Sequence, residues 1–269
     1  MGKPLILITN DDGYLAQGLL ALREELERVG EVWVLAPDRN WSAASRTRVF
    51  HKPLRVSPVR LPDGVLVHIT NGSPSDCVSL ALLGLAPRRP DIVVSGVNAG
   101  ANLGRDVTYS GTVAAAMEAA QWGVPAVAIS QDLGPEREEG EEVRSPDYRR
   151  AARFAAVLVE RLLEEKVLPP GALLNVNVPL VAPKGIRITR LGTSIWKDYL
   201  VKGKDPHGRD YYWLAGEMLA SPPPGEEDTD VWAVFSGYIS ITPLQLDLTD
   251  HGLLKELRTW ERKLSLPAE

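Results

Sequence analysis

The sequence predicts an α/β fold with a doubly wound, mostly parallel, Rossmann-like sheet and an extended C-terminal arm or hairpin. Short apolar runs at residues 5–8 and 91–94 are typical of strands buried on both faces of a parallel sheet. Helical patterns such as residues 18–29 alternate with these runs, and this alternation favours βαβ units. An aromatic-rich segment at residues 190–230 then interrupts the alternation, which indicates the arm.

In the N-terminal half, each expected element has its own local signal. Leucines at helical spacing define the first helix, which Gly30 ends, and Pro37 stops the second strand. An Ala-rich stretch predicts the third helix. The strands expected here lie at residues 5–8, 32–35, 66–69, 91–94 and 124–129, and the helices at residues 18–29, 75–83 and 112–122.

In the C-terminal half, a charged, loop-like stretch at residues 134–147 precedes the next helix. That helix is expected at residues 148–165, with Ala, Phe and Leu on one face, and a strand follows at residues 173–178. Beyond the arm, the C-terminal part at residues 231–269 contributes a strand at 231–241 and a closing helix at 251–264. The chain of 269 residues fits a single domain, residues 1–269, with the arm as an excursion from it.

The arm is rich in aromatic residues and ends near a Pro-Pro-Pro-Gly sequence. Its aromatic residues are Trp196, Tyr199, Tyr211, Tyr212 and Trp213. Such side chains are enriched in protein interfaces, so the arm is a candidate contact between subunits. A surface loop packed on its own core explains the same composition, and the sequence leaves both interpretations open.

Composition excludes several classes of protein. The 30 basic and 35 acidic residues give a formal net charge of −5, and no basic stripe of the kind that binds nucleic-acid polymers is present. The apolar run near the N-terminus is too short for a signal peptide, and no stretch reaches the length of a membrane span. Cys77 is the only cysteine, which suits a reducing compartment. We therefore expect a soluble, cytoplasmic protein.

An acidic pair, Asp11 and Asp12, directly follows the first strand. In open α/β sheets the ligand site lies beyond the carboxyl ends of the strands. Two adjacent carboxylates repel each other, and a hard divalent cation with oxygen ligands would neutralise both. The alternative is a simple turn at Asp12-Gly13, with Asp11 capping the following helix. The position at a strand end favours a site.

Polar and Gly-rich loops follow two other strands and would reach the same edge of the sheet. One is the loop at residues 38–42, and the other is the loop at residues 95–104. The second is neither a dinucleotide fingerprint nor a Walker P-loop. Asn98 and Asn102 within it offer amide oxygens to a metal and NH₂ groups to a phosphate. Each loop alone is also consistent with a flexible turn, but together they describe a cleft.

The start of the Ala-rich helix is a candidate phosphate site. Ser110, Gly111 and Thr112 open this helix, whose free N–H groups and partial positive charge attract anions. Gly111 permits close approach of the backbone. An ordinary N-cap by Ser110 or Thr112 explains the same residues, and capping is compatible with anion binding.

Other common chemistries find no support in the sequence. The four histidines have no metal-ligand spacing, and no G-x-S-x-G elbow indicates a Ser-His-Asp hydrolase. Cys77 lies in a helical pattern and is more typical of a small core residue than of a nucleophile.

Five segments of the chain together resemble the SurE (survival protein E) family. They occur in the family's order and span almost the whole chain, so the resemblance is specific. The segments are Ile8-Thr9-Asn10-Asp11-Asp12-Gly13, Ala36-Pro37-Asp38-Arg39-Asn40, the run from Ser95 to Asn102, the run from Tyr109 to Ala116, and the run from Gly237 to Leu244.

The resemblance implies a phosphomonoesterase that releases phosphate from nucleoside 5′-monophosphates. Its substrate range would extend to 3′-monophosphates and short polyphosphate. It implies one Mg²⁺ or Mn²⁺ ion per subunit, with ligands that map onto Asp11, Asp12, Ser42 and Asn98. This chain has Ala43 where the family usually has glycine, which changes the backbone freedom of that loop. The resemblance further implies a homodimer or homotetramer whose C-terminal arms exchange between subunits.

The hypothesis for the reaction assigns roles to these residues. The catalytic candidates are Asp11 and Asp12, and Asp12 would exchange a proton with the attacking water or the leaving ribose oxygen. The residues expected to bind phosphate or substrate are Asn10, Asn98, Gly100, Asn102, Ser110, Gly111 and Thr112.

Two other functions remain open at this point. An aspartyl-phosphate phosphatase would use an Asp-x-Asp pair, whereas Asp11 and Asp12 are adjacent. A nucleotide-binding sensor without turnover would use the acids only as caps.

Overall fold

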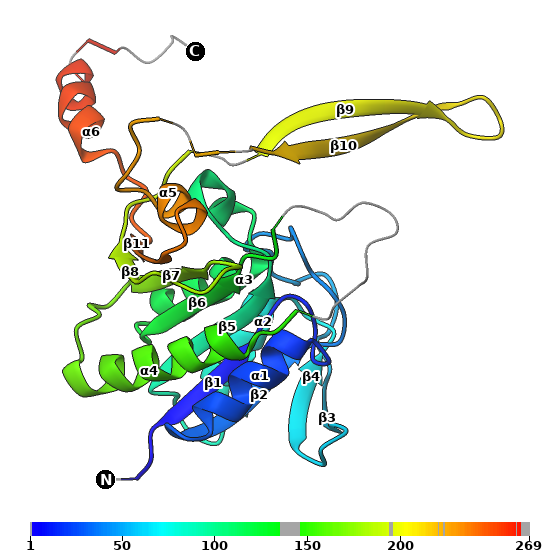
Figure 1. Ribbon diagram of the computed structural model, residues 1–269, viewed down its shortest axis with the longest axis vertical. Coiled ribbons are helices and arrows are strands. Elements are labelled where there is room, and N and C mark those ends of the chain that lie inside the picture. The colour runs from blue at the N-terminus through cyan, green and yellow to red at the C-terminus, as the bar shows by residue number, and fades with distance from the viewer. Residues whose placement is uncertain are drawn as a thin grey trace.

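The computed structural model confirms the α/β fold, with a mostly parallel sheet between layers of helices (Figure 1). It describes residues 2–134, 146–193, 196–219, 221–222, 224–261 and 263–264. Most of the predicted loop at residues 134–147, the side chain of Trp196 and part of the Pro-Pro-Pro-Gly sequence lie outside this part of the chain.

The main sheet has nine strands in the order β3-β4-β2-β1-β5-β6-β7-β11-β8. Strands β3 and β11 run antiparallel to their neighbours β4 and β7, and the other pairings are parallel. The strands are β1 (Leu5–Thr9), β2 (Glu31–Pro37), β3 (Val56–Arg60), β4 (Leu66–Thr70), β5 (Ile92–Ala99), β6 (Ala126–Gln131), β7 (Ala172–Val178), β8 (Ile186–Ile188) and β11 (Ile239–Gln245).

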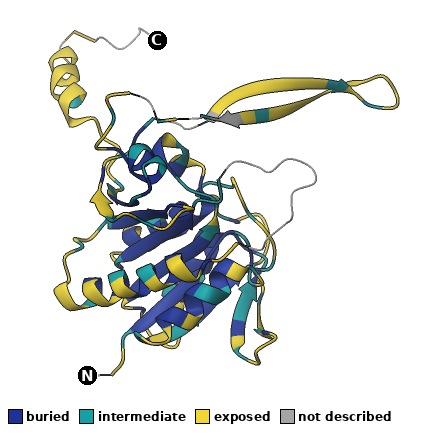
Figure 2. Ribbon diagram, in the orientation of Figure 1, coloured by how far each residue is buried: buried dark blue, intermediate teal, exposed yellow. Residues whose placement is uncertain are grey.

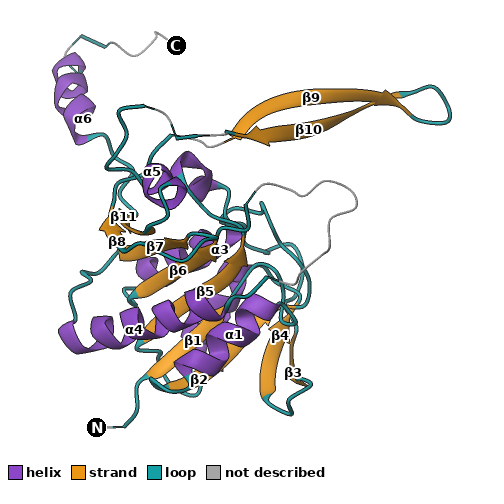
Figure 3. Ribbon diagram, viewed as in Figure 1, coloured by secondary structure: helices purple, strands orange, loops and turns teal. Residues whose placement is uncertain are grey.

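Helices cover both faces of this sheet (Figure 3). One core lies under α1 and α4 and takes alternate strand residues such as Ile6 and Ile8, and the other lies under α2 and α3 and takes Leu7. Figure 2 shows that the central strands are buried almost throughout. The helices are α1 (Gln17–Leu26), α2 (Pro74–Leu80), α3 (Gly111–Gln121), α4 (Arg149–Glu165), α5 (Asp230–Phe235) and α6 (His251–Leu257).

The chain reverses its direction across the sheet between β1 and β5. From β1 it proceeds outward through β2 and β4, and it then returns to place β5 on the other side of β1. Adjacent loops diverge at such a switch point, which opens a crevice at the carboxyl ends of the two strands. The acidic pair follows β1, and Asn98 lies near the end of β5, so the topology brings both to this crevice.

The predicted strand at residues 231–241 is wrong in its first half. Residues from Asp230 to Phe235 form the helix α5, and only β11 from Ile239 onward is extended. Thr229 caps the helix by accepting a hydrogen bond from the backbone N–H of Trp232, and Gly237 follows its end at φ +82°. These capping signals outweigh the strand preference of the Val, Trp and Phe residues between them.

Two edge strands, β3 and β8, were not expected from the sequence. Strand β3 contains Pro58, which is tolerated only where no partner needs its N–H, and β3 lies at one edge of the sheet. Strand β8 has only three residues. The predicted closing helix is also shorter than expected, since α6 ends at Leu257 and continues as a 3₁₀ turn, Arg258–Trp260.

The segment at residues 190–230 holds an antiparallel hairpin of β9 (Trp196–Lys204) and β10 (Asp210–Met218). The hairpin forms its own two-stranded sheet and extends away from the body of the molecule (Figure 1). None of the helices in the described part of the chain combines the length and apolar character that crossing a bilayer requires.

Candidate functional site

The acidic pair lies between β1, β5 and the start of α3. Asp11 is only 3% exposed, and its Oδ1 accepts a hydrogen bond from the Thr112 hydroxyl. Asp12 is partly exposed, and its Oδ2 accepts from the backbone N–H of Ala99 at 3.3 Å. Asp11 is therefore fixed against the helix start, whereas Asp12 remains partly accessible to solvent.

The N-terminus of α3 packs directly against Asp11. Ser110 is the N-cap, and its Oγ accepts from the backbone N–H of Val113 at 3.1 Å. A Cβ added to Gly111 would lie 2.7 Å from the Asp11 Cβ, closer than real Cβ atoms come, so only glycine fits there. The helix start and the carboxylate thus share one small space.

Burial and mutual repulsion disfavour the ionised forms of both acids. Burial raises the pKa of Asp11 despite the hydrogen bonds from Thr112 and the backbone of Gly111. Burial, and then the charge of Asp11, raise the pKa of Asp12 to about 6. Within the described residues, no Lys, Arg or His forms an ion pair with either carboxylate. The charge of the pair therefore has no protein counter-ion there.

These donors fit a divalent cation. Beside the two carboxylates, Asn10 is fully buried, and its Oδ1 has no hydrogen-bond partner in the described part of the chain, while its Nδ2 donates to Gly13 O at 2.9 Å. Such hard oxygen ligands suit Mg²⁺ or Mn²⁺. Among the described residues, no cluster of three or more His, Cys, Asp or Glu forms a metal site. A cation would consequently rely on the two Asp residues together with neutral oxygens.

The loop that carries Ser42 is tied to the acidic pair through its backbone. The Trp41 N–H donates to Asp11 O at 2.7 Å, and the exposed Ser42 donates its N–H to Asn40 Oδ1 at 2.6 Å. Ala43 has φ +60°, the left-handed region in which glycine is favoured. Asp38, from the same loop, is paired with Arg39 (Nε to Oδ1 2.7 Å), so it brings no free charge to the site.

The asparagines of the 95–104 loop differ in their surroundings. Asn98 Nδ2 donates to Gly100 O at 2.8 Å, one residue from the Ala99 N–H that contacts Asp12. Asn102 is turned into the protein: its Nδ2 donates to Ser130 Oγ at 2.7 Å, and its backbone bonds to Asn175 and Asn177. The structure thus brings Asn98 and Gly100 close to the acidic pair and engages Asn102 in a network that supports the loop.

The sequence interpretation missed residues that support the site. Tyr148 lies near Asp12, since burial and the charge of Asp12 raise the pKa of its hydroxyl. Glu118 is buried in α3 and binds Arg46 from the Ser42 loop. The available signal for Glu118 was its position as the one charged residue within an Ala-rich helix.

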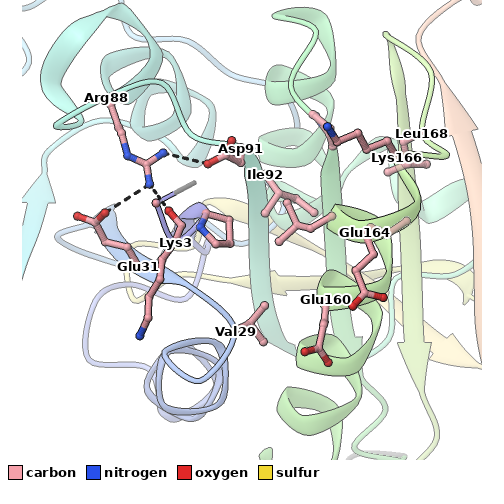
Figure 4. A pocket seen from close by; sticks show the side chains of 15 residues that line it. Lys3, Val29, Glu31, Arg88, Asp91, Ile92, Glu160, Glu164, Lys166 and Leu168 are labelled. Atoms are coloured by element: carbon pink, nitrogen blue, oxygen red, sulfur yellow. Dashed lines mark hydrogen bonds and ion pairs between the residues drawn. The ribbon is translucent and has the colours of Figure 1, made fainter.

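A cavity of about 890 Å³ lies at the opposite, amino edge of the sheet (Figure 4). Arg88 lies at one side of it and binds Asp91 at 2.9 Å, Lys3 O at 2.6 Å and Glu31 at 3.4 Å. Its guanidinium is therefore already occupied by protein groups. The cavity is remote from the switch point, so volume alone does not identify the functional site here.

The raised pKa of Asp12 predicts a pH dependence in the metal-free protein. Because this pKa is about 6 when folded and 3.8 ordinarily, the folded chain binds more protons between these values. The Asp12 contribution to the free energy of unfolding should therefore fall as pH rises from 3.8 to about 6. We expect Asp12→Asn to remove this contribution and to stabilise the metal-free protein above pH 7 by about 1–3 kcal/mol, allowing for partial exposure.

Urea unfolding of metal-free native and Asp12→Asn proteins between pH 4 and 8 measures this difference. A constant difference in stability across that range would contradict the prediction.

The comparisons with known proteins agree on one family. The family model described as "Survival protein SurE" matches residues 6–198. A "5′-nucleotidase SurE" from Chloroflexus aggregans is 51% identical over 263 residues, covering 95% of this chain and 98% of that protein. "5′-nucleotidase SurE 1" from Thermus thermophilus is 45% identical over 258 residues, covering 94% and 96%. The crystal structure of the SurE protein from Aquifex aeolicus matches with a TM-score of 0.79 and 39% identity, covering 96% of this chain and all of that one.

Proposed function

Because the chain belongs to the SurE family, we propose that it is a divalent-metal-dependent 5′-nucleotidase that hydrolyses nucleoside 5′-monophosphates. The observation that carries this proposal is the acidic pair Asp11 and Asp12, which has no basic partner among the described residues and lies beside the N-terminus of α3, at the switch point of the sheet. A metal site at the two acids would then lie next to an anion-binding site at the start of α3. Phosphoryl transfer requires such an arrangement.

We propose Asp11, Asp12, Ser42 and Asn98 as the residues that hold one Mg²⁺ or Mn²⁺ ion per subunit. The backbone bond from Trp41 to Asp11 and the bond from Ala99 to Asp12 support this set, because they join the neighbours of Ser42 and Asn98 to the acids. When bound, the cation supplies charge neutralisation for the phosphate and lowers the pKa of a water molecule.

Other residues of the chain are proposed to bind the phosphate and the rest of the substrate. The positive end of α3, at Gly111 and Thr112, attracts the phosphate oxygens, while the backbone N–H groups of these two residues donate to Asp11. Asn10, Asn98, Gly100 and Ser110 line the same substrate seat, and Asn102 supports the loop from behind.

Asp12 is the better placed acid to exchange a proton with the attacking water or the leaving ribose oxygen. It is partly exposed and has a pKa near 6, whereas Asp11 is buried and held by Thr112.

A substrate screen tests the function directly. Purified protein is incubated with AMP, 3′-AMP or short polyphosphate, with Mg²⁺, Mn²⁺ or EDTA, and released phosphate and bound metal are measured. We expect release from AMP that requires the metal, with one ion per subunit. Tight AMP binding without phosphate release would indicate a sensor, and a trapped phospho-aspartate would indicate the covalent mechanism.

We propose that the β9–β10 hairpin joins subunits into a homodimer or homotetramer. Apolar side chains cover both of its faces, since the cross-strand pair Leu200 and Leu214 lies on one face and the pair Val201 and Trp213 on the other. All four are exposed, with Leu214 at 89%. An exposed apolar hairpin of this kind is typical of an interaction surface.

The double variant Trp213→Glu with Leu214→Glu is expected to give a smaller particle than the native chain, because it places charge on both faces of the hairpin. Light scattering after gel filtration measures the mass, and Arg209→Glu at the hairpin tip is the matched control. A monomeric native chain, or an unchanged mass in the double variant, would contradict the proposal.

We further propose a cytoplasmic location, with neither a membrane nor a nucleic-acid polymer as partner. The lone, buried Cys77 and the net charge of −5 support these assignments.

A further inference from the structure

Glu118 is a fully buried carboxylate that the proposed reaction does not use. It is the one charged residue of α3 and is 0% exposed. Its Oε2 accepts from Arg46 Nη2 at 2.9 Å and Nε at 3.2 Å. Its Oε1 accepts from Ser79 Oγ at 2.8 Å and Trp122 Nε1 at 3.1 Å. A buried carboxylate that accepts four hydrogen bonds restrains the side chains that donate them.

The cations that meet Glu118 come from the loop that carries Ser42. Arg46 binds it directly, and Arg48 Nη1 lies 3.8 Å from its Oε1. Glu118 itself belongs to the helix whose first residues are the proposed phosphate seat. The contact therefore joins the Ser42 loop to α3 through two residues, Arg46 and Glu118, that are 72 apart in the sequence.

The contact is an ion pair at neutral pH. Burial acts to raise the pKa of Glu118, but hydrogen bonds from Arg46, Ser79 and Trp122 outweigh burial and hold this pKa below its ordinary value. Removing the charge of Arg46 leaves the buried Glu118 carboxylate without its direct counter-ion.

The loop needs such support, because part of its backbone is intrinsically unfavourable. Ala43 and Ser45 have φ of +60° and +52°, where side chains other than glycine are disfavoured. Ser45 is held by a bond from its N–H to Tyr109 O at 3.0 Å and from its Oγ to Thr108 O at 2.7 Å. The tethers of the loop thus converge on α3 and the turn before it.

A second set of contacts fixes the far end of the loop without Glu118. Ser73 Oγ donates to Thr47 O at 2.6 Å, and the Val49 N–H donates to both carboxylate oxygens of Asp76 at 3.2 and 3.3 Å. Loss of Glu118 would therefore release the loop at Arg46, while residues 47–49 and the contacts of Ser45 with Thr108 and Tyr109 stay in place.

We propose that Glu118 is a positioning residue, which holds the 42–46 loop against α3 through Arg46 and thereby sets Ser42 beside the acidic pair. The significance for metal binding rests on the proposed function, whereas the closure of the loop does not. Glu118 lies outside the set of residues proposed to hold metal and substrate, so its proposed effect on the site passes through Arg46.

The variant Glu118→Gln tests this in the full-length protein by trypsin digestion and by calorimetric titration with Mn²⁺. We expect cleavage after Arg46 to become about tenfold faster, relative to cleavage after Arg209 at the hairpin tip. We expect the Kd for Mn²⁺ to rise about 10-fold to 100-fold, as for other residues that orient metal ligands. Unchanged cleavage together with an unchanged Kd would overturn the proposal.

Arg46→Gln gives an independent test should Glu118→Gln fail to fold, since Arg46 is partly exposed. It removes the trypsin site, so cleavage after Arg48 is followed instead, and the same change in Kd is expected. Arg153→Gln is the matched control, because Arg153 pairs with Glu25 at 3.2 Å between α1 and α4, away from the loop. If Arg153→Gln changed the Kd equally, the effect of Glu118→Gln would reflect a general loss of stability, and the positioning role would be overturned.

The two proposals can fail separately. If the native protein neither binds Mn²⁺ nor releases phosphate, the proposed function fails, and digestion alone decides whether Glu118 closes the loop. If the native protein is active and Glu118→Gln changes neither cleavage nor Kd, only the positioning role fails.

Discussion

Asp11→Asn is expected to lower kcat/KM for AMP by about 10³-fold or more and to remove the bound metal. The loss in rate is large because a central electrostatic interaction in the transition state is lost. Asn retains the size of Asp and an oxygen that can accept from the Thr112 hydroxyl, so the local packing is preserved. The change removes one of the two negative charges that attract the cation. Initial rates and metal content by mass spectrometry measure the two effects together.

Asp63→Asn is the matched control for Asp11→Asn. Asp63 lies in the turn between β3 and β4, at the opposite edge of the sheet, where it pairs with Arg23. The same change from carboxylate to amide should leave turnover and metal content at native levels there. Native activity in Asp11→Asn, or full metal content without activity loss, would remove Asp11 from the proposed site.

Gly111→Ala is expected to lower kcat by about 10²-fold, because a displacement of about 1 Å in a reacting group has an effect of this size. Alanine favours helices over glycine by about 1 kcal/mol, so helix propensity alone predicts a more stable protein. The added Cβ would however lie 2.7 Å from Asp11 Cβ and 2.8 Å from Asp11 Oδ2. Asp11 is buried and held by Thr112, so the steric conflict shifts the carboxylate or the helix start.

Gly252→Ala separates this steric effect from propensity. Gly252 also lies in the first turn of a helix, α6, and its added Cβ would meet only the end of the Asp250 side chain at 3.2 Å. We expect native kcat in Gly252→Ala and a lower melting temperature in Gly111→Ala, consistent with overpacking by about 1–3 kcal/mol. Native kcat and stability in Gly111→Ala would show that the helix start is not packed on Asp11 as described.

The sequence predicted most of the parallel sheet because its central strands are buried on both faces. The runs that form β1 and β5 are apolar at successive positions, and only this kind of strand has such a pattern. Elements at the edges were harder to predict. Strand β3 is short and contains Pro58, and α5 has strand-forming residues between a Thr cap and a Gly stop.

The sequence by itself also predicted which residues form the candidate site. Asp11 and Asp12 follow a buried strand, Asn98 lies near the end of another, and Ser110 opens a helix, and each of these signals is local in the chain. The resemblance to the SurE family then grouped them with Ser42.

Only the tertiary structure decided how these residues meet. Thr112 and Asp11 are 101 residues apart, and Arg46 and Glu118 are 72 apart, yet each pair is in direct contact. Periodicity and capping report the immediate neighbours of a residue along a strand or helix, whereas these contacts depend on strand order. The return of the chain to place β5 beside β1 puts the start of α3 against Asp11, and no local pattern encodes that choice.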